Sequence, residues 1–192
     1  MFTSAHRQQR EQLLNQHSCV IWLTGLSGAG KTTLANALSN HLHQSGKLCT
    51  VLDGDVLRDG LNKGLSFSEA DRTENIRRAA ETARILLNTG IITICSFISP
   101  THALRAMARS IVGENDFIEV FVNSSLATCE QRDVKGLYAK ARRGEIPVFT
   151  GITAPFEAPL RPHVELRTDQ QTEAQSLAQL LQFIAPRIEF AK

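Results

Sequence analysis

The sequence predicts an α/β fold in which a parallel sheet is covered by helices on both faces. Apolar, β-branched runs recur at 18–24, 47–52, 91–98 and 117–122, with a weaker run near 163–167. Segments of helical periodicity lie between these runs, and this alternation with short turns is typical of a parallel sheet. The chain of 192 residues has no internal repeat or linker, so we expect a single domain with a substantial core.

Composition and charge restrict the partners and the compartment. A formal net charge of +2 is too weak for a general nucleic-acid footprint. Residues 1–17 are polar, and no apolar run approaches the length of a membrane span, so we expect neither nucleic acid nor membrane as a partner. The scattered cysteines lack C-x-x-C pairs, which is typical of reduced thiols in a cytoplasmic protein; they are Cys19, Cys49, Cys95 and Cys129. The expected organisation is a polar N-terminal extension over 1–17 and one domain over 18–192.

The first apolar run leads into a phosphate-binding pattern. The residues that follow it fit G-x-x-x-x-G-K-[ST] and precede a helical segment that ends near Gly46; they are Gly25, Leu26, Ser27, Gly28, Ala29, Gly30, Lys31, Thr32 and then Thr33. Glycines let backbone N–H groups approach phosphate closely, Lys31 would reach the β and γ phosphates, and the Thr32 hydroxyl would ligate Mg²⁺. The sequence therefore predicts a three-layer P-loop NTPase fold that binds ATP and Mg²⁺; a flexible strand-to-helix turn is the alternative.

The segment after the second run supplies carboxylates. Ligands of such sheets bind beyond the carboxyl ends of the strands, so the residues that follow each strand are candidates. The second run is followed by Asp53-Gly54-Asp55-Val56-Leu57-Arg58, whereas Ile98-Ser99-Pro100 and Asn123-Ser124 follow the next two. The acidic group beside Mg²⁺ or the attacking hydroxyl is therefore Asp55 or Asp53, unless these residues only cap the next helix.

A long helix is predicted from about Glu69 to Asn88. Ser68 with Asp71 indicates its start, Gly90 follows its end, and its apolar stripe is Ile76, Ala79, Ala80, Ala83 and Leu87. Arg72 and Asn75 lie off this stripe near the end that faces ligands, which favours contact with an anion or a base. The more distant arginines on this helix, Arg77, Arg78 and Arg84, are interpreted as a solvated face.

A cationic, glycine-punctuated segment follows the fourth run. We expect residues 131–159 to form a mobile lid that closes over phosphates; the segment contains Arg132, Lys135, Gly136, Lys140, Arg142, Arg143, Gly144, Pro147 and Gly151. An ordinary basic helix surface is the alternative, favoured for Lys140 and Arg143. The last helix is predicted near 172–184, with Pro186 as its stop.

At this point the sequence resembles the adenylylsulfate kinase (APS kinase) family. The resemblance covers about 18–170 and, beyond the phosphate loop, rests on the blocks Leu52-Asp-Gly-Asp-Val-Leu-Arg58, Phe67-Ser-Glu-Ala-Asp-Arg-Thr-Glu-Asn-Ile-Arg-Arg78, Phe97-Ile-Ser-Pro100, Phe117-Ile-Glu-Val-Phe-Val122, Arg132-Asp-Val-Lys-Gly-Leu-Tyr138, Phe149-Thr-Gly-Ile152 and Ala154-Pro-Phe-Glu-Ala-Pro159. It implies transfer of the ATP γ-phosphoryl group to the 3′-hydroxyl of adenosine 5′-phosphosulfate (APS) in sulfate assimilation, by a homodimer. The products would be 3′-phosphoadenosine 5′-phosphosulfate (PAPS) and ADP.

The resemblance also implies roles for individual residues. Arg58, Arg72 and Asn75 would hold the phosphosulfate, and Phe67 and Phe149 would sandwich the adenine. The rest of the acceptor site would be lined by Ile98, Ser99, Lys135, Gly136 and Leu137. Asp55 would orient or deprotonate the 3′-hydroxyl and hold a Mg²⁺-bound water, while Lys31 and Arg132 would balance charge. Some family members carry a phosphorylated serine at the position of Ser99, but the sequence shows no base beside it, which favours direct transfer.

Departures from the family pattern occur at Val56, Ser66, Val134, Thr153 and Phe156, none of which is assigned to chemistry. Two other functions are compatible with a phosphate loop. One is a small-molecule P-loop kinase that acts on a nucleoside monophosphate or a sugar acid. The other is a nucleotide-binding switch protein, which would need N-K-x-D for guanine, whereas Asn62-Lys63-Gly64-Leu65 has Leu65 in place of the aspartate.

Overall fold

A parallel sheet forms the centre of the computed structural model, which describes residues 4–190. Five strands lie in the order β2-β3-β1-β4-β5, and every neighbouring pair is parallel. In chain order they are β1 (Val20–Thr24), β2 (Cys49–Asp53), β3 (Ile92–Ser96), β4 (Phe117–Asn123) and β5 (Val164–Arg167). Each strand falls within or beside one of the predicted apolar runs, so the predicted α/β fold with a parallel sheet is confirmed.

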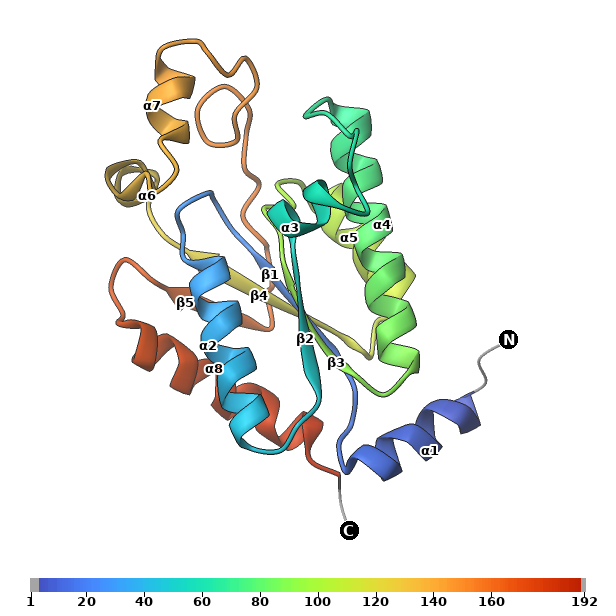
Figure 1. The fold of residues 1–192 in the computed structure, drawn as a ribbon. Coiled ribbons are helices and arrows are strands. Elements are labelled where there is room, and N and C mark those ends of the chain that lie inside the picture. The colour runs from blue at the N-terminus through green and yellow to red at the C-terminus, as the bar shows by residue number, and fades with distance from the viewer. Residues whose placement is uncertain (1–3, 191–192) are drawn as a thin grey trace.

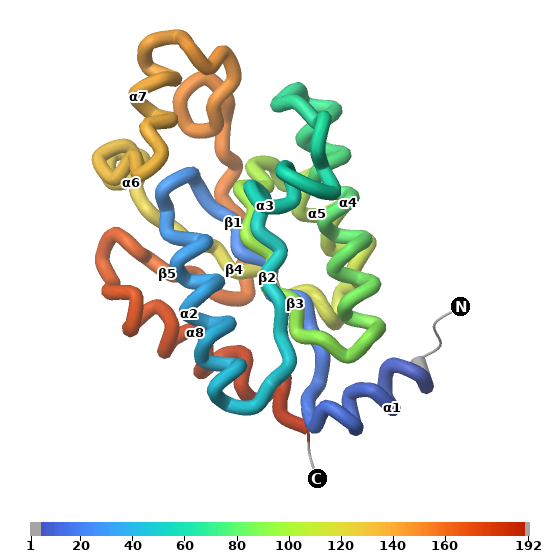
Figure 2. The backbone as a smooth tube through the Cα atoms, in the orientation of Figure 1, coloured from blue at the N-terminus to red at the C-terminus, as the bar shows by residue number. Residues whose placement is uncertain are grey.

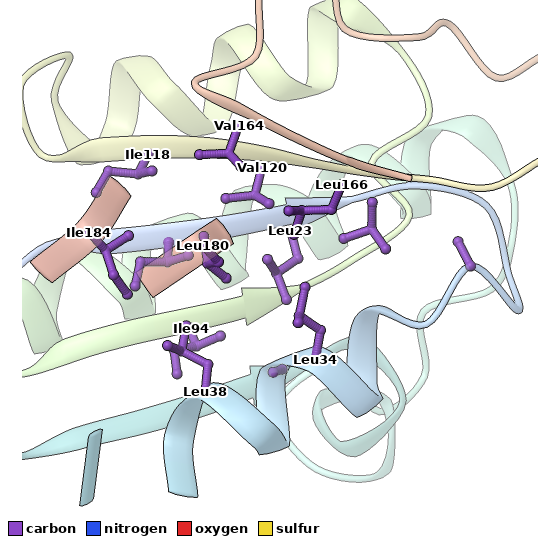
Figure 3. Close-up of a cluster of buried hydrophobic side chains, with 14 of the residues drawn as sticks. Leu23, Leu34, Leu38, Ile94, Ile118, Val120, Val164, Leu166, Leu180 and Ile184 are labelled. Carbon is purple, nitrogen blue, oxygen red and sulfur yellow. The ribbon is translucent and has the colours of Figure 1, made fainter. Parts of the chain in front are cut away.

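Helices cover both faces of the sheet and produce three layers (Figure 1). On one face, α2 (Lys31–Gln44) and α8 (Glu173–Ile188) pack on alternate strand residues; Figure 3 shows Leu34, Leu38, Leu180 and Ile184 meeting Leu23, Ile94 and Val120. On the other face, α4 (Glu69–Asn88) and α5 (His102–Val112) cover Val20 and Trp22 of β1. Successive residues of β1 thus point to opposite faces and are buried on both, as expected for a central parallel strand.

The segment predicted as a polar extension contains a helix, α1 (Ser4–Leu14), while residues 1–3 lie outside the described part of the chain. Arg7 ties this helix to the domain by two hydrogen bonds of 2.7 and 2.8 Å to the Asp116 carboxylate. The buried Gln16 side chain donates to the carbonyls of Leu48 and Gly90, both at 2.8 Å. The polar side chains of this segment therefore dock it against the sheet's amino end rather than leave it as a tail.

The last helix is longer than predicted. Pro186 was expected to stop α8, but the helix continues to Ile188. Proline lacks an N–H group, so it removes one intrahelical bond, and a position in the last turn keeps that loss small. The helical bonding pattern continues beyond the proline, since Glu189 N donates to Ala185 O at 3.1 Å.

Three short helices gather at the carboxyl end of the sheet, opposite α1 (Figure 1). They are α3 (Gly54–Asp59), α6 (Leu126–Arg132) and α7 (Leu137–Arg142). Figure 2 shows the chain curling back after α7 before it descends into β5. We refer to residues 131–159 as the lid segment. Within residues 4–190 no helix is both long enough and apolar enough to cross a membrane.

Candidate active site

A large cavity opens at the carboxyl end of the sheet, between the phosphate loop, α3, α4 and the lid segment. Its volume is about 1020 Å³, at the upper end of the range for small-molecule sites. Most of the predicted site residues line it: Ser27, Gly28, Gly30, Lys31, Thr32, Thr33, Asp55, Arg58, Phe67, Arg72, Asn75, Ile98, Ser99, Arg132, Lys135, Leu137 and Phe149. Gly25, Leu26, Ala29 and Gly136 are not among the lining residues. One cavity thus brings together residues that are more than 100 positions apart.

The phosphate loop joins β1 to α2 in a conformation that favours glycine at two positions. Gly28 and Gly30 have φ values of 76° and 98°. At Gly25 a Cβ atom would lie 2.3 Å from the carbonyl oxygen of Val122, so any side chain would push the loop off β4. The loop therefore keeps its backbone close to the sheet and opens towards the cavity at the start of α2.

Lys31 is the first residue of α2, and its side chain is buried. Its Nζ donates to the carbonyls of Gly25 at 3.0 Å and Leu26 at 2.7 Å, so the ammonium group lies across the phosphate loop. Burial lowers the pKa of Lys31 to about 8, and the carboxylates of Asp53 and Asp55 oppose this shift only in part. A bound phosphate would supply the negative charge that this buried cation lacks.

Thr32 and Asp53 bring two oxygen ligands together beside the loop. The Thr32 Oγ1 donates to Asp53 Oδ2 at 2.8 Å, while Asp53 Oδ1 accepts from the Asp55 N–H at 2.9 Å and caps α3. A hydroxyl and a carboxylate suit Mg²⁺, which usually takes one or two protein oxygens and completes its shell with phosphates and water. Residues 4–190 hold no group of three His, Cys, Asp or Glu side chains that could bind a metal without such help.

The sequence left Asp53 and Asp55 open for the acidic role, and the structure separates them. Asp53 lies against Thr32, whereas Asp55 points to the lid segment and forms an ion pair with Lys135. Both partners of this pair are more than half exposed. Asp53, which the sequence offered only as an alternative to Asp55, is therefore the carboxylate that lies beside the candidate Mg²⁺ ligand Thr32.

A cationic and aromatic wall faces the phosphate loop across the cavity. The Arg58 guanidinium lies 4.4 Å from the centre of the Phe67 ring, and its Nη1 donates to Leu65 O at 3.0 Å. Arg72 reaches the lid segment, where it donates to Thr150 Oγ1 at 2.9 Å and to Val148 O at 3.0 Å. Partial burial lowers the pKa of both arginines. This wall presents donors and positive charge, which is the chemistry that binds sulfate and phosphate.

The two predicted stacking rings differ in their surroundings. Phe67 is 61% exposed and Phe149 only 8%. Phe149 stands edge-on to Tyr138, with ring centres 4.9 Å apart, and the Tyr138 hydroxyl donates to Ser27 O in the phosphate loop at 2.9 Å. The lid segment is thus joined to the phosphate loop through Tyr138, a residue that the predicted set omits.

Ser99 is buried in the wall of the cavity. Its Oγ donates to Thr24 Oγ1 at 3.0 Å and accepts from Trp22 Nε1 at 3.1 Å, and its backbone has a positive φ of 37°. Its carbonyl accepts from the buried Arg105 at 2.9 Å, a contact that no local pattern indicated. The Ser99 hydroxyl is therefore engaged with the sheet.

Arg132 ends α6 and turns towards the phosphate loop. It donates to Gly28 O at 3.2 Å and to Thr168 O at 2.6 Å, which places its charge beside the loop and next to the segment after β5. Thr168 completes this link, because its hydroxyl donates to Ala29 O at 2.7 Å.

Of the five departures from the family pattern, only Val134 lines the cavity. Val56 and Val134 are exposed, Ser66 donates to Asp71, Thr153 Oγ1 accepts from Phe149 N at 2.8 Å, and Phe156 stacks on Phe121 with ring centres 5.9 Å apart. None of these five positions carries a residue to which the sequence assigns a chemical role.

Comparison with known proteins identifies the family. The family model for adenylylsulphate kinase matches residues 17–167. Adenylyl-sulfate kinase of Bacteroides thetaiotaomicron is 55% identical over 95% of this chain and 91% of its own length. The structure of Mycobacterium tuberculosis APS kinase CysC in complex with AMPPNP and APS is similar with a TM-score of 0.85 and 42% identity, over 88% of this chain and 98% of that one.

A more distant relative also matches this chain. The hexameric APS kinase from Thiobacillus denitrificans is 28% identical with a TM-score of 0.69, and the match covers 95% of this chain but 31% of that longer one. The family model spans most of the chain, and the likeness to the Bacteroides protein extends over nearly its whole length. The chain belongs to the adenylylsulphate kinase family.

Proposed function

We propose that this protein transfers the γ-phosphoryl group of ATP to the 3′-hydroxyl of adenosine 5′-phosphosulfate, giving 3′-phosphoadenosine 5′-phosphosulfate and ADP. The observation that carries the proposal is the single cavity in which a phosphate loop faces a wall of arginines and phenylalanines. Its volume of about 1020 Å³ leaves room for a donor and an acceptor nucleotide. The family and the M. tuberculosis complex with AMPPNP and APS support the same pair of substrates.

The donor would lie on the phosphate loop. Backbone N–H groups of residues 25–33 would bind the phosphates, and Lys31 would exchange its contacts with Gly25 and Leu26 for phosphate oxygens. Thr32 and Asp53 would hold Mg²⁺, with Asp55 in reach of it through water. When bound, the ion neutralises phosphate charge.

The acceptor would lie on the opposite wall. Arg58, Arg72 and Asn75 would bind the phosphosulfate, while Phe67 and Phe149 would hold the adenine between them. Ile98, Ser99 and Leu137 line the same space, with Lys135 and Gly136 at its lid side. This assignment places the 3′-hydroxyl between the two walls, near Asp55.

The chemical step needs positioning and charge balance more than covalent help. The 3′-oxygen forms a bond to the γ-phosphorus, the bond from that phosphorus to the bridging oxygen breaks, and ADP leaves with the electron pair. Asp55 orients the hydroxyl and accepts its proton, while Lys31 and Arg132 balance the charge that moves. Because the Ser99 hydroxyl is buried and engaged with Trp22 and Thr24, direct transfer is favoured over a phosphoserine intermediate.

An ADP-release assay tests the proposal, with APS, AMP, gluconate or no acceptor offered to the same enzyme. We expect turnover with APS to exceed that with the other acceptors by at least about a hundredfold, since the donors of the arginine wall would bind both the phosphate and the sulfate of APS, and neither AMP nor gluconate has the sulfate. Rapid turnover of gluconate or AMP would instead support another small-molecule P-loop kinase. ADP release that ignores the acceptor would support a nucleotide-binding switch protein.

Location and assembly belong to the same proposal. All four cysteines are free, and burial raises the pKa of Cys19 to about 12, which suits a reducing, cytoplasmic setting. We also propose a homodimer, as the family resemblance implies, although the T. denitrificans relative is hexameric. Light scattering of the purified chain would decide between the two assemblies.

A further inference from the structure

Asn62 lies directly behind a residue of the acceptor wall. It belongs to the turn between α3 and α4, and its side chain is fully buried. Its Nδ2 donates to the Asn75 Oδ1 at 2.9 Å. Backbone bonds hold the turn on both sides, since Asn62 N donates to Leu57 O at 2.7 Å and Leu65 N donates to Asn62 O at 3.1 Å. The Asn62 side chain is therefore fixed before any ligand arrives.

This contact determines which end of the Asn75 amide is available to a ligand. Asn75 lines the cavity with an exposed fraction of 6%, whereas Asn62 does not line it. The Oδ1 of Asn75 is occupied by Asn62, so the Nδ2 group with its two donors is what remains for a ligand. No residue within the described range 4–190 accepts a hydrogen bond from that Nδ2 group.

Burial favours this orientation over the reverse one. In the observed arrangement Asn62 Oδ1 is a buried acceptor without a partner. If both amides were turned over, that oxygen would pair with Asn75 Nδ2, but the Asn62 NH₂ group would be buried with two unpaired donors. Unpaired carbonyl oxygens are less rare in proteins than unpaired N–H groups, and each unmade bond is costly. The interior thus selects the arrangement in which Asn75 offers donors to the cavity.

We propose that Asn62 is a positioning residue that makes Asn75 a donor towards the acceptor substrate. Arg58 and Arg72, on the same wall, also carry donors and no acceptor. With Asn75 held in this way, the wall recognises an end group that has only acceptor oxygens, such as a phosphosulfate. The inference rests on the proposed function, and it deepens it by assigning part of the acceptor selectivity to a side chain outside the cavity.

The test replaces Asn62 by leucine, which has a similar volume and no donor, and measures the binding of APS and ATP separately by calorimetry. We expect the Kd for APS to rise about tenfold, because a hydrogen bond to a charged group is weakened. The Kd for ATP should change less than about twofold, and kcat at saturating APS should fall less than about threefold, since the effect lies on acceptor binding. The matched control is Thr93→Val, which removes a buried hydroxyl at the amino end of β3 and should leave both Kd values unchanged.

A double-mutant cycle separates positioning from a general structural effect. In an Asn75→Ala background, Asn62→Leu should change the Kd for APS by less than about twofold. An equal loss in both backgrounds, an equal weakening of ATP and APS, or an unchanged Kd for APS in a folded Asn62→Leu protein would each overturn the inference. If thermal unfolding shows that the leucine variant does not fold, Asn62→Ala, which lacks the donor and adds no bulk, is measured against the same expectations.

The inference and the proposed function can fail separately. If the unsubstituted protein does not bind APS, the proposed function is wrong. If it binds APS and transfers phosphate to it while the Asn62 variants bind APS as tightly as the parent, only the role of Asn62 is wrong.

Discussion

The Lys135 ammonium and the Asp55 carboxylate form an ion pair that joins the lid segment to the first turn of α3. Both groups line the cavity, and both are more than half exposed, so solvent can compete for each of them. A substrate hydroxyl that binds to Asp55 would have to displace or share the lysine. The pair therefore couples the position of the lid segment to the availability of the carboxylate.

Asp55→Asn should lower kcat by about 10²- to 10⁴-fold, because the amide cannot accept the proton of the hydroxyl. Binding of ATP should change little. The matched control is Asp59→Asn at the end of the same helix, where the side chain is exposed. Equal rates for the Asp55 variant and the parent would exclude Asp55 from the chemistry.

We expect the affinity for ATP to depend on pH through the protonation of Lys31. Burial lowers the pKa of its ammonium group to about 8 in the free protein, and phosphate raises it again on binding. The complex therefore takes up a proton: affinity is full below pH 8 and falls as the pH rises above it. We expect the Kd for ATP to be about tenfold weaker at about pH 9 than at about pH 7.

Calorimetry in buffers of different ionisation enthalpy measures this proton uptake directly. Lys31→Met should bind ATP weakly and lose the dependence, while Lys63→Met, an exposed lysine on another turn, should keep it. A Kd that stays constant across this pH range would contradict the assignment of Lys31 to the phosphates.

Ser99→Ala should retain kcat within about tenfold and lose stability. The substitution removes the partner of the buried Trp22 Nε1 and one bond to Thr24 Oγ1, a loss of about 1–3 kcal/mol in the free energy of unfolding. Steady-state kinetics and urea unfolding measure the two effects. An inactive variant, together with an ATP-dependent phosphoserine in the parent that APS discharges, would instead establish a covalent intermediate.

Arg72→Ala should weaken APS binding by about ten- to a hundredfold while ATP binding stays nearly constant, because a fork of charged donors is lost. The same change also removes the contacts to Val148 and Thr150, so limited proteolysis of the lid segment should become faster. Arg77→Ala on the same helix is the control, since Arg77 pairs with Glu74 at the surface. Equal weakening of both ligands would assign Arg72 to the scaffold.

The elements that the sequence predicts best are those whose signal is local. The phosphate loop, the five strands and the Ser68 cap of α4 depend on neighbouring residues, and all are found where expected. The prediction that Pro186 stops α8 was wrong, because the rule that proline ends a helix does not consider that a proline in the last turn removes only one bond. The structure of α1 was missed because its docking depends on Asp116, about a hundred positions away.

The site residues also divide into those that a local pattern predicts and those that depend on contacts between separate segments. Spacing within one helix placed Arg72 and Asn75 on the cavity, but Asp53 could be separated from Asp55 only once Thr32 was in place beside it. Arg105 and Asn62 donate hydrogen bonds to Ser99 and Asn75, and no pattern around either residue indicates such a partner. Residues that hydrogen-bond to the lining residues from other segments are therefore the part of the site that could not be predicted from the sequence alone.

The central claim is that phosphate from ATP reaches the 3′-oxygen of APS in this cavity. The most direct measurement follows the label from γ-³²P-ATP in the presence of APS and Mg²⁺, with the product identified by mass and by treatment with a 3′-specific nucleotidase. We predict that the label appears in a nucleotide heavier than APS by one phosphoryl group and is released by the 3′-specific enzyme. Label found only in inorganic phosphate, or in a product that the 3′-specific enzyme leaves intact, would contradict the account.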